Sequence, residues 1–222
     1  MRFVPLPQRF YEPSAQVVAP LLLGHWLIRN TPRGFCGGPI VEAEAYLVGD
    51  PASHAIMGET ARNRVMFGPP GRAYVYLIYG FHFCFNAVCH PVGRAEAVLV
   101  RAIEPLFGEV QMRQNRPTPH PASLTNGPGK LCAAMDIKRG LDGADLCDSA
   151  SPLFIAANPE LDRFLAGRGP LVRTTRVGLT KAAGLHLRYY LDKSPFVSRR
   201  VRPAFSRTTP RPAASAPERR AR

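Results

Sequence analysis

Two glutamates and a tyrosine alternate with small apolar residues in segment 41–46, which reads VEAEAY. Successive side chains of a strand point to opposite faces, so Glu42, Glu44 and Tyr46 would share one face, with neighbouring carboxylates about 7 Å apart. If that face lines a cleft, one carboxylate could draw a proton from water, as hydrolysis without a metal requires. If it meets solvent, the same residues form only a charged strand surface. Because Glu42 and Glu44 would lie side by side, a carbohydrate hydrolase with one acid on each side of a sugar is disfavoured.

Aromatic residues are concentrated in segment 74–86, which holds three tyrosines and three phenylalanines in 13 residues. This density predicts β-strands, and Tyr79-Gly80 interrupts the alternation where a hairpin tip would lie. Tyrosines on a strand pair can stack on unpaired bases or wedge into a base step of DNA. The same residues could instead form the aromatic core of a hairpin.

Arg101 and Lys130 are further candidates for a charged site. Arg101 ends the apolar run 97–100, where it either meets a carboxylate partner such as Glu44 or reaches water. Segment 127–130, GPGK, places Lys130 beside a predicted helix N-terminus. Such a position is favourable for binding a phosphate, although many helices begin in this way. Four other residues lack a standard zinc spacing, so we expect no metal: His82, Cys84, Cys89 and His90.

The charge of the chain favours a polyanionic partner. Its 222 residues include 29 Lys+Arg against 16 Asp+Glu, a formal net charge of +13. Hydrophobic residues make up 45%, enough for the core of one domain, which we place at residues 1–198. Residues 199–222 are rich in arginine and proline and poor in large apolar side chains, so we expect a disordered tail. This tail could be a phosphate-binding arm or simply a solvated terminus.

Helices and strands are predicted without strict alternation. Capping residues, a proline at a first helical position and apolar spacing indicate four helices. These cover residues 15–23, 104–113, 128–135 and 161–166. Strand patterns cover residues 40–47, 97–100, 171–177 and 185–191. We therefore expect an α+β fold: a single domain on a curved, largely antiparallel sheet flanked by helices, with a protruding aromatic β-hairpin.

The apolar runs are too short to span a bilayer, and the N-terminal segment lacks the unbroken apolar stretch of a secretory signal. Five cysteines, an odd number without a C-x-x-C pair, suit neither a disulfide framework nor a zinc ribbon. We expect a cytoplasmic protein in a reducing compartment, with no membrane partner.

Taken together, these segments resemble the alkyladenine (3-methyladenine) DNA glycosylase family, of the monofunctional, metal-free type found in mammals and many bacteria. The resemblance covers about residues 22–198. The motifs that carry it are VEAEAY (41–46), His54, RNR (62–64), YVYLIYG (74–80), CFN (84–86), LVRA (99–102), GPGKLC (127–132) and RVG (176–178).

The resemblance implies catalytic roles for three residues. Glu44 falls on the general base that deprotonates the attacking water, and Arg101 and the backbone carbonyl of Val177 fall on the groups that hold this water. Tyr46 and Tyr76 match the aromatic walls between which the flipped base stacks.

Other matches concern the base edge and the DNA. His54 matches the donor to the base edge, and Asn86 matches the residue whose bulk disfavours the amino group of guanine. Tyr79 matches the wedge that enters the minor groove. Phosphate contacts fall at or near four residues: Thr60, Arg62, Lys130 and Arg139.

The implied activity is that of a monofunctional DNA glycosylase in base excision repair. It would flip alkylated purines out of duplex DNA, hydrolyse the N-glycosidic bond and leave an abasic site, with deaminated purines as a further class to test. Its partner would be double-stranded DNA containing damaged purines. We expect a monomer without a cofactor, associated with the nucleoid in a bacterium or nuclear in a eukaryote. The alternative is a non-catalytic nucleic-acid-binding module that uses the same basic surface and hairpin.

Three features depart from the family pattern. The hairpin reads Phe81-His82 where mammalian members have a different pair, and both the spacing between His54 and Thr60 and the proline-rich loop at residues 115–126 look shorter. These departures concern the preference among lesions and the binding of DNA rather than the class of reaction.

Overall fold

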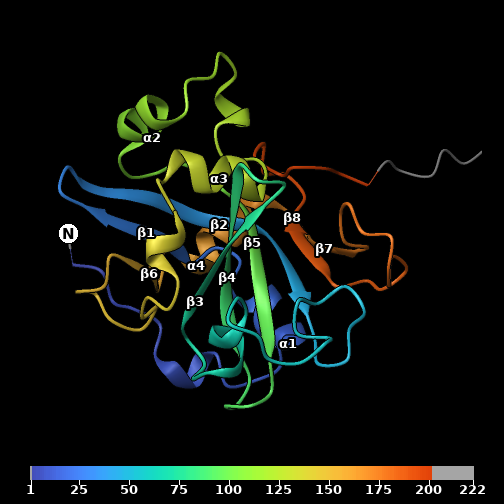
Figure 1. Cartoon of the computed structure of the whole chain (residues 1–222). Coiled ribbons are helices and arrows are strands. Elements are labelled where there is room, and N and C mark those ends of the chain that lie inside the picture. The colour runs from blue at the N-terminus through green and yellow to red at the C-terminus, as the bar shows by residue number, and fades with distance from the viewer. Residues whose placement is uncertain (1, 202–222) are drawn as a thin grey trace, which may run out of the picture.

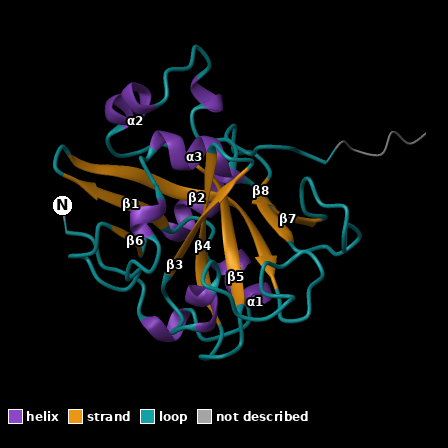
Figure 2. Cartoon of the chain, viewed as in Figure 1, coloured by secondary structure: helices purple, strands orange, loops and turns teal. Residues whose placement is uncertain are grey.

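The computed structural model describes residues 2–201. The tail expected at residues 199–222 therefore lies outside the described residues from position 202 onward. Helices and strands are mixed along the chain (Figures 1 and 2). The α-helices are α1 (Ala15–Leu21), α2 (Glu109–Asn115), α3 (Pro128–Ala134) and α4 (Leu161–Arg168). The strands are β1 (Trp26–Thr31), β2 (Gly34–Tyr46), β3 (Ala73–Ile78), β4 (His82–Cys89), β5 (Glu96–Ile103), β6 (Leu153–Ala156), β7 (Leu171–Thr174) and β8 (Arg188–Leu191). Short 3-10 helices are η1 (Gln8–Phe10), η2 (Arg64–Phe67), η3 (Pro121–Ser123) and η4 (Arg139–Leu141).

The strands form one sheet in the order β3-β4-β5-β2-β1-β6, with β8 paired to β2 and β7 paired to β8. Every pairing between these strands is antiparallel. The long β2 joins the two parts of the sheet, because its first half pairs with β1 and its second half pairs with β5 and β8. In Figure 1 the sheet curls, and β3, β4 and β5 run steeply across β2. The predicted α+β fold on a curved antiparallel sheet is confirmed.

The two faces of the sheet differ in what they bury. One face carries small and branched apolar residues, such as Ala43 of β2 and Val98 of β5, and residues of α1 and α3 complete the main hydrophobic core with them. Side chains alternate along a strand, so the intervening residues point to the opposite face. That second face carries the residues that the sequence singled out: Glu42, Glu44 and Tyr46 of β2, Tyr76 of β3, Asn86 of β4 and Arg101 of β5.

Helix α1 packs on β2 and β5. It begins at Ala15, whose N–H donates to Glu96 Oε2 at 2.8 Å, whereas the N-cap residue Ser14 makes no side-chain cap. A buried carboxylate from β5 therefore ties the first turn of α1 to the sheet. Helix α3 begins with Pro128 at its first position, as the sequence predicted.

The predicted aromatic hairpin is formed by β3 and β4. Ile78 pairs with His82, and the turn residues Tyr79 and Gly80 have positive φ angles of 53° and 79°. Glycine adopts such angles freely, whereas a residue with a side chain does so rarely. Tyr79 and Phe81 are 76% and 71% exposed, so the tip presents two bare aromatic rings.

One predicted helix and two predicted strands have different bounds in the structure. The helix predicted at residues 104–113 begins only at Glu109, because Gly108 takes a left-handed conformation with φ of 61° immediately before it. The strands predicted at residues 171–177 and 185–191 are shorter than expected: β7 ends at Thr174 and β8 begins at Arg188, and the segment between them is irregular. Strands β1 and β6 were not predicted. No helix in residues 2–201 has both the length and the apolar character needed to cross a membrane.

Candidate active site

The second face of the sheet borders a cavity of about 440 Å³. Side chains of β2, β3, β4 and β5 form part of its wall, together with Met66 of η2 and Tyr79 of the hairpin turn. Residues 52–54 and 177–179 add two loops to the wall, and residues 127–130 add the beginning of α3. The strand residues on which the site depends are Tyr46, Tyr74, Tyr76, Asn86 and Arg101.

Glu44 is fully buried and touches three residues that line this cavity. Its Oε1 atom accepts a hydrogen bond from the Val177 N–H at 2.8 Å and lies 3.2 Å from Arg101 Nη1. Its Oε2 atom accepts from the Tyr46 hydroxyl at 3.1 Å. Burial and the charge of Glu44 raise the pKa of Tyr46, so this phenol stays protonated and donates. A carboxylate has about four acceptor sites, so one site on Oε2 has no partner within residues 2–201.

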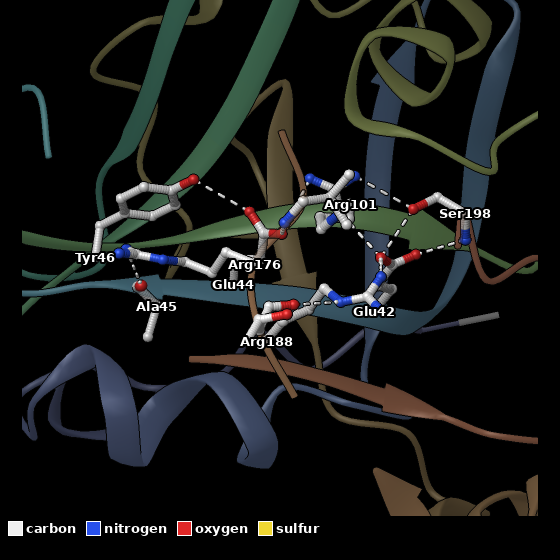
Figure 3. A network of polar contacts seen from close by, with 10 residues as sticks. Glu42, Glu44, Ala45, Tyr46, Arg101, Arg176, Arg188 and Ser198 are labelled. Atoms are coloured by element: carbon white, nitrogen blue, oxygen red, sulfur yellow. Dashed lines mark hydrogen bonds and ion pairs between the residues drawn. The ribbon is translucent and has the colours of Figure 1, made fainter. Parts of the chain in front are cut away.

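Arg101 holds its guanidinium between the two glutamates of β2 (Figure 3). Its Nε donates to Glu42 Oε1 at 2.9 Å, and its Nη2 donates to Ser198 Oγ at 3.2 Å. Its Nη1 is the atom that faces Glu44. Burial lowers the pKa of Arg101, but the charges of Glu44 and Glu42 raise it above the ordinary value. Arg101 is therefore a permanent cation that bridges two buried carboxylates.

Glu42 is also fully buried, but its surroundings differ from those of Glu44. Its Oε1 atom accepts from Arg101, from Arg188 Nη1 at 2.8 Å and from the Ser198 hydroxyl at 2.8 Å. Its Oε2 atom accepts from the Ser198 N–H at 2.6 Å. Neither Glu42 nor Glu44 is itself among the residues that line the cavity. The interpretation of this strand face as a solvated surface is wrong, and the two carboxylates differ in their contacts: Glu42 meets one lining residue, Arg101, whereas Glu44 meets three.

A second buried ion pair joins two loops of the cavity wall. Arg176 forms a bidentate pair with Asp50, with 3.0 Å between Nη2 and Oδ1, and the two side chains are 0% and 1% exposed. Arg176 also donates to the β2 carbonyl that precedes Tyr46, and its guanidinium lies 4.5 Å from the centre of the Tyr46 ring. The pair thus fixes the neighbour of Val177 against the loop that leads to His54 (Figure 3 shows Arg176 beside Tyr46).

Aromatic rings form another part of the wall. The Tyr74 and Tyr76 rings are 5.3 Å apart at 31°, and the His54 ring is 4.3 Å from Tyr76. His54 Nδ1 and the Tyr74 hydroxyl are 3.0 Å apart. Burial and then the charge of Arg62 lower the pKa of His54, and burial raises the pKa of Tyr74 to about 12. At neutral pH the imidazole is neutral and the phenol keeps its proton. Asn86 is held beside them, because its Nδ2 donates to the Tyr74 carbonyl at 3.2 Å.

Two of the expected phosphate contacts are Lys130, in the first turn of α3, and Thr60, in a loop. Lys130 lines the cavity and donates to Asn126 Oδ1 at 2.8 Å, and burial lowers its pKa. Thr60 donates from both its N–H and its hydroxyl to Asn63 Oδ1, at 2.6 and 2.9 Å. Lys130 therefore joins the predicted site, whereas Thr60 does not line the cavity.

The other two, Arg62 and Arg139, are attached to the aromatic hairpin. Arg62 donates to the Leu77 carbonyl at 2.9 Å, and its guanidinium lies 5.8 Å from the Tyr76 ring. Arg139 donates to the Val75 carbonyl at 2.8 Å. Neither lines the cavity, and both brace β3 from outside.

The structure thus brings the predicted catalytic and base-pocket residues together around one cavity, with Tyr79 at its rim. The Val177 N–H contacts Glu44, and the role that the resemblance implies for the Val177 carbonyl, holding the attacking water, stays a prediction. Sequence reasoning gave no role to five residues that hold the site: Asp50, Tyr74, Arg176, Arg188 and Ser198. Of these, Tyr74 carried a usable signal because it alternates with Tyr76 on one strand, and Arg176 carried one because it belongs to the RVG motif; the other three carried none.

In residues 2–201 no three His, Cys, Asp or Glu side chains lie where they could share a metal ion. The five cysteines are free.

Comparisons with known proteins agree on one family. The family model described as methylpurine-DNA glycosylase (MPG) matches residues 9–195. A relative from Methanoculleus marisnigri is 50% identical over 196 residues, which cover 88% of this chain and 99% of the relative. A relative from Koribacter versatilis is 44% identical, with 89% and 94% covered. One from Rhodopseudomonas palustris is 44% identical, with 87% and 88% covered. The names of all three contain the words 3-methyladenine DNA glycosylase.

Proposed function

Because this chain belongs to the methylpurine-DNA glycosylase family, we propose that it releases alkylated purines from double-stranded DNA by hydrolysing the N-glycosidic bond with a water activated by Glu44. Family membership makes the chain a DNA glycosylase, a hydrolase of DNA repair. The observation that carries the mechanism is the environment of Glu44, a fully buried carboxylate fixed by Val177, Arg101 and Tyr46 with one acceptor site to spare.

Glu44 acts as the general base through Oε2. The contacts of Val177 and Arg101 occupy Oε1, so a water on Oε2 gives its proton to the carboxylate as its oxygen bonds to the anomeric carbon. The electron pair of the broken glycosidic bond leaves with the base. The sugar gains oxocarbenium character in this step, and the negative charge of Glu44 stabilises it. A positively charged alkylated purine is already a good leaving group, so no strong acid is needed for it.

The flipped base stacks between Tyr46 and Tyr76. An electron-poor alkylated ring stacks well on tyrosine. His54 Nδ1 and the Tyr74 hydroxyl are within hydrogen-bond distance, and we assign the donor role to the hydroxyl; the proton of the neutral imidazole is then on Nε2, where it donates to the base edge. Asn86, held by its bond to the Tyr74 carbonyl, disfavours the amino group of guanine.

Rotating a nucleotide out of a duplex costs a few kcal/mol, and least for a damaged or mispaired base. Tyr79 at the exposed hairpin tip enters the minor groove and fills the gap. Thr60, Arg62, Lys130 and Arg139 contact phosphates around it. The enzyme acts as a monomer without a cofactor, in the cytoplasm at the nucleoid or in a nucleus.

The test uses duplexes that each carry one lesion: 3-methyladenine, 7-methylguanine, hypoxanthine or ethenoadenine. Alkali then reveals abasic sites as strand breaks at the lesion. Glu44→Gln should abolish base release and keep most of the affinity for the damaged duplex, because the amide cannot take the proton. Glu109→Gln is the matched control, since among residues 2–201 Glu109 forms an ion pair only with Arg113, on the surface of α2. An unchanged single-turnover rate in Glu44→Gln would rule out the mechanism. A wild-type protein that binds damaged and undamaged duplex equally and releases no base would be a binding module.

A further inference from the structure

We propose that Glu42 is a positioning residue for base release: it holds Arg101 so that the guanidinium meets only one oxygen of Glu44 and leaves the other open to water. This inference rests on the proposed role of Glu44. Glu42 is fully buried, both of its oxygens accept hydrogen bonds from Arg101, Arg188 or Ser198, and of these only Arg101 lines the cavity, so it acts through its neighbours.

Arg101 is shared between two carboxylates. A guanidinium binds a single carboxylate most strongly through two parallel hydrogen bonds. Arg101 instead donates a hydrogen bond from Nε to Glu42 Oε1 at 2.9 Å, and its Nη1 forms an ion pair with Glu44 Oε1 at 3.2 Å. Without the charge of Glu42, Glu44 would be the remaining carboxylate beside this buried cation, and a two-point contact would occupy Oε2 as well. Glu42 therefore keeps Oε2 free by drawing Nε away.

Glu42 also acts on the segment that carries Val177. Arg188 donates from Nη1 to Glu42 at 2.8 Å and from Nε to the Thr175 carbonyl at 3.1 Å. Thr175 lies beyond the end of β7, so no strand ladder fixes it and side chains must hold it instead. Two residues later, the Val177 N–H binds Glu44 Oε1. Through Arg101 and Arg188, Glu42 orders two of the three groups that contact Glu44.

Ser198 closes this arrangement from the C-terminal side (Figure 3). Its hydroxyl donates to Glu42 Oε1 and accepts from Arg101 Nη2, and its N–H donates to Glu42 Oε2. Ser198→Ala removes one link between Glu42 and Arg101 and leaves every charge in place. Ser194→Ala is its matched control, because within the described part of the chain the buried Ser194 hydroxyl accepts only from the Phe196 N–H and touches neither glutamate.

The experiment compares Glu42→Gln, Ser198→Ala and Ser194→Ala with the wild-type protein. The rate of 3-methyladenine release from methylated DNA is measured at saturating enzyme and expressed per active molecule. Affinity is measured on a duplex that carries a tetrahydrofuran abasic analogue, and the melting temperature is recorded for each variant. This separates the rate of the chemical step from binding and from the folded fraction.

We expect Glu42→Gln to slow release per active molecule about 10- to 100-fold, the effect of one charge-assisted hydrogen bond on a rate. Ser198→Ala should slow it about 2- to 10-fold, Ser194→Ala should not, and affinity should stay the same in all three. A Glu42→Gln protein that melts lower but releases base at the wild-type rate per active molecule overturns the proposal. A Ser198→Ala rate equal to the Ser194→Ala rate also overturns the proposal. If the Glu42→Gln protein does not fold, the comparison of these two serine variants decides the question by itself. A wild-type protein that releases no base overturns the proposed function and this inference with it, whereas normal wild-type release with unchanged variants overturns this inference only.

Discussion

Replacing Asp50 by Asn should destabilise the protein strongly and slow base release. Asp50 is the carboxylate partner of Arg176, and both side chains are shielded from water. The amide has nearly the same shape but lacks the charge that compensates the guanidinium. The Nε atom of Arg176 is buried and has no hydrogen-bond partner within residues 2–201. No contact at Nε therefore compensates the guanidinium when the charge of Asp50 is removed.

The size of the effect follows from burial. Removing one partner of a buried ion pair costs about 3–5 kcal/mol, and 1 kcal/mol shifts the melting temperature of a domain this size by about 2–4 °C. The melting temperature of Asp50→Asn should therefore fall by roughly 6–20 °C. The pair of Arg113 and Glu109 is 36% and 48% exposed, and such helix pairs contribute about 0.3–0.5 kcal/mol. Glu109→Gln should accordingly shift the melting temperature by less than about 2 °C.

Thermal melting and urea titration measure the stability loss, and single-turnover base release measures the rate. The rate should fall because Arg176 adjoins Val177 and lies over the Tyr46 ring. Adding Arg176→Met to Asp50→Asn removes the uncompensated cation, so the double variant should regain stability without regaining rate. A stability loss in Asp50→Asn no larger than that in Glu109→Gln would refute the reasoning.

Three other outcomes test separate parts of the site. Tyr79→Ala should leave stability within about 0.5 kcal/mol, because the ring is exposed, and slow base release about 5- to 150-fold through lost stacking, measured under single turnover. Gly129→Ala would place its Cβ 3.0 Å from His82 Cγ, so the His82 side chain must shift at the cavity wall and release should slow, whereas Gly140→Ala, with nothing within 4 Å, should not change it. Burial lowers the pKa of His25, and burial and the charge of Arg62 lower that of His54. As the pH falls, these two histidines therefore bind protons in the unfolded chain before they do so in the folded chain. The free energy of unfolding should thus be highest above about pH 6.5 and decline below it, and a flat urea midpoint across this range would contradict the assignment.

The parts of the site that could be predicted are those set by local geometry. Alternation along one strand puts Glu42, Glu44 and Tyr46 on the same face, whatever the strand packs against. The same rule places Tyr76 with them, and the interruption at Tyr79-Gly80 marks the hairpin tip. The sequence also offered Glu44 as a partner for Arg101, although it could not show that Glu42 shares the same guanidinium.

The contacts that hold these residues could not be predicted because they join distant segments. Arg176 and Asp50 are 126 positions apart, and Ser198 and Glu42 are 156 apart. Asp50, Arg176 and Ser198 lie in irregular segments, where no periodic pattern indicates which way a side chain points. The helix predicted at residues 104–113 was wrong for a related reason, since helical spacing does not reveal where the chain turns in a left-handed conformation at a glycine.

The balance of buried charge around the cavity bears on which bases can enter it. Three carboxylates and three guanidiniums meet on this side of the sheet: Glu42, Glu44, Asp50, Arg101, Arg176 and Arg188. Buried ion pairs are seldom more stabilising than well-packed apolar residues of the same volume, so stability alone does not account for such a cluster. Two of the guanidiniums hold the segment around Val177, and without Glu42 and Asp50 they would leave the site with an excess of positive charge. A cationic alkylated purine would be repelled by that excess. Neutralising the arginines that position Val177 allows the proposed enzyme to combine a rigid base, Glu44, with a positively charged substrate.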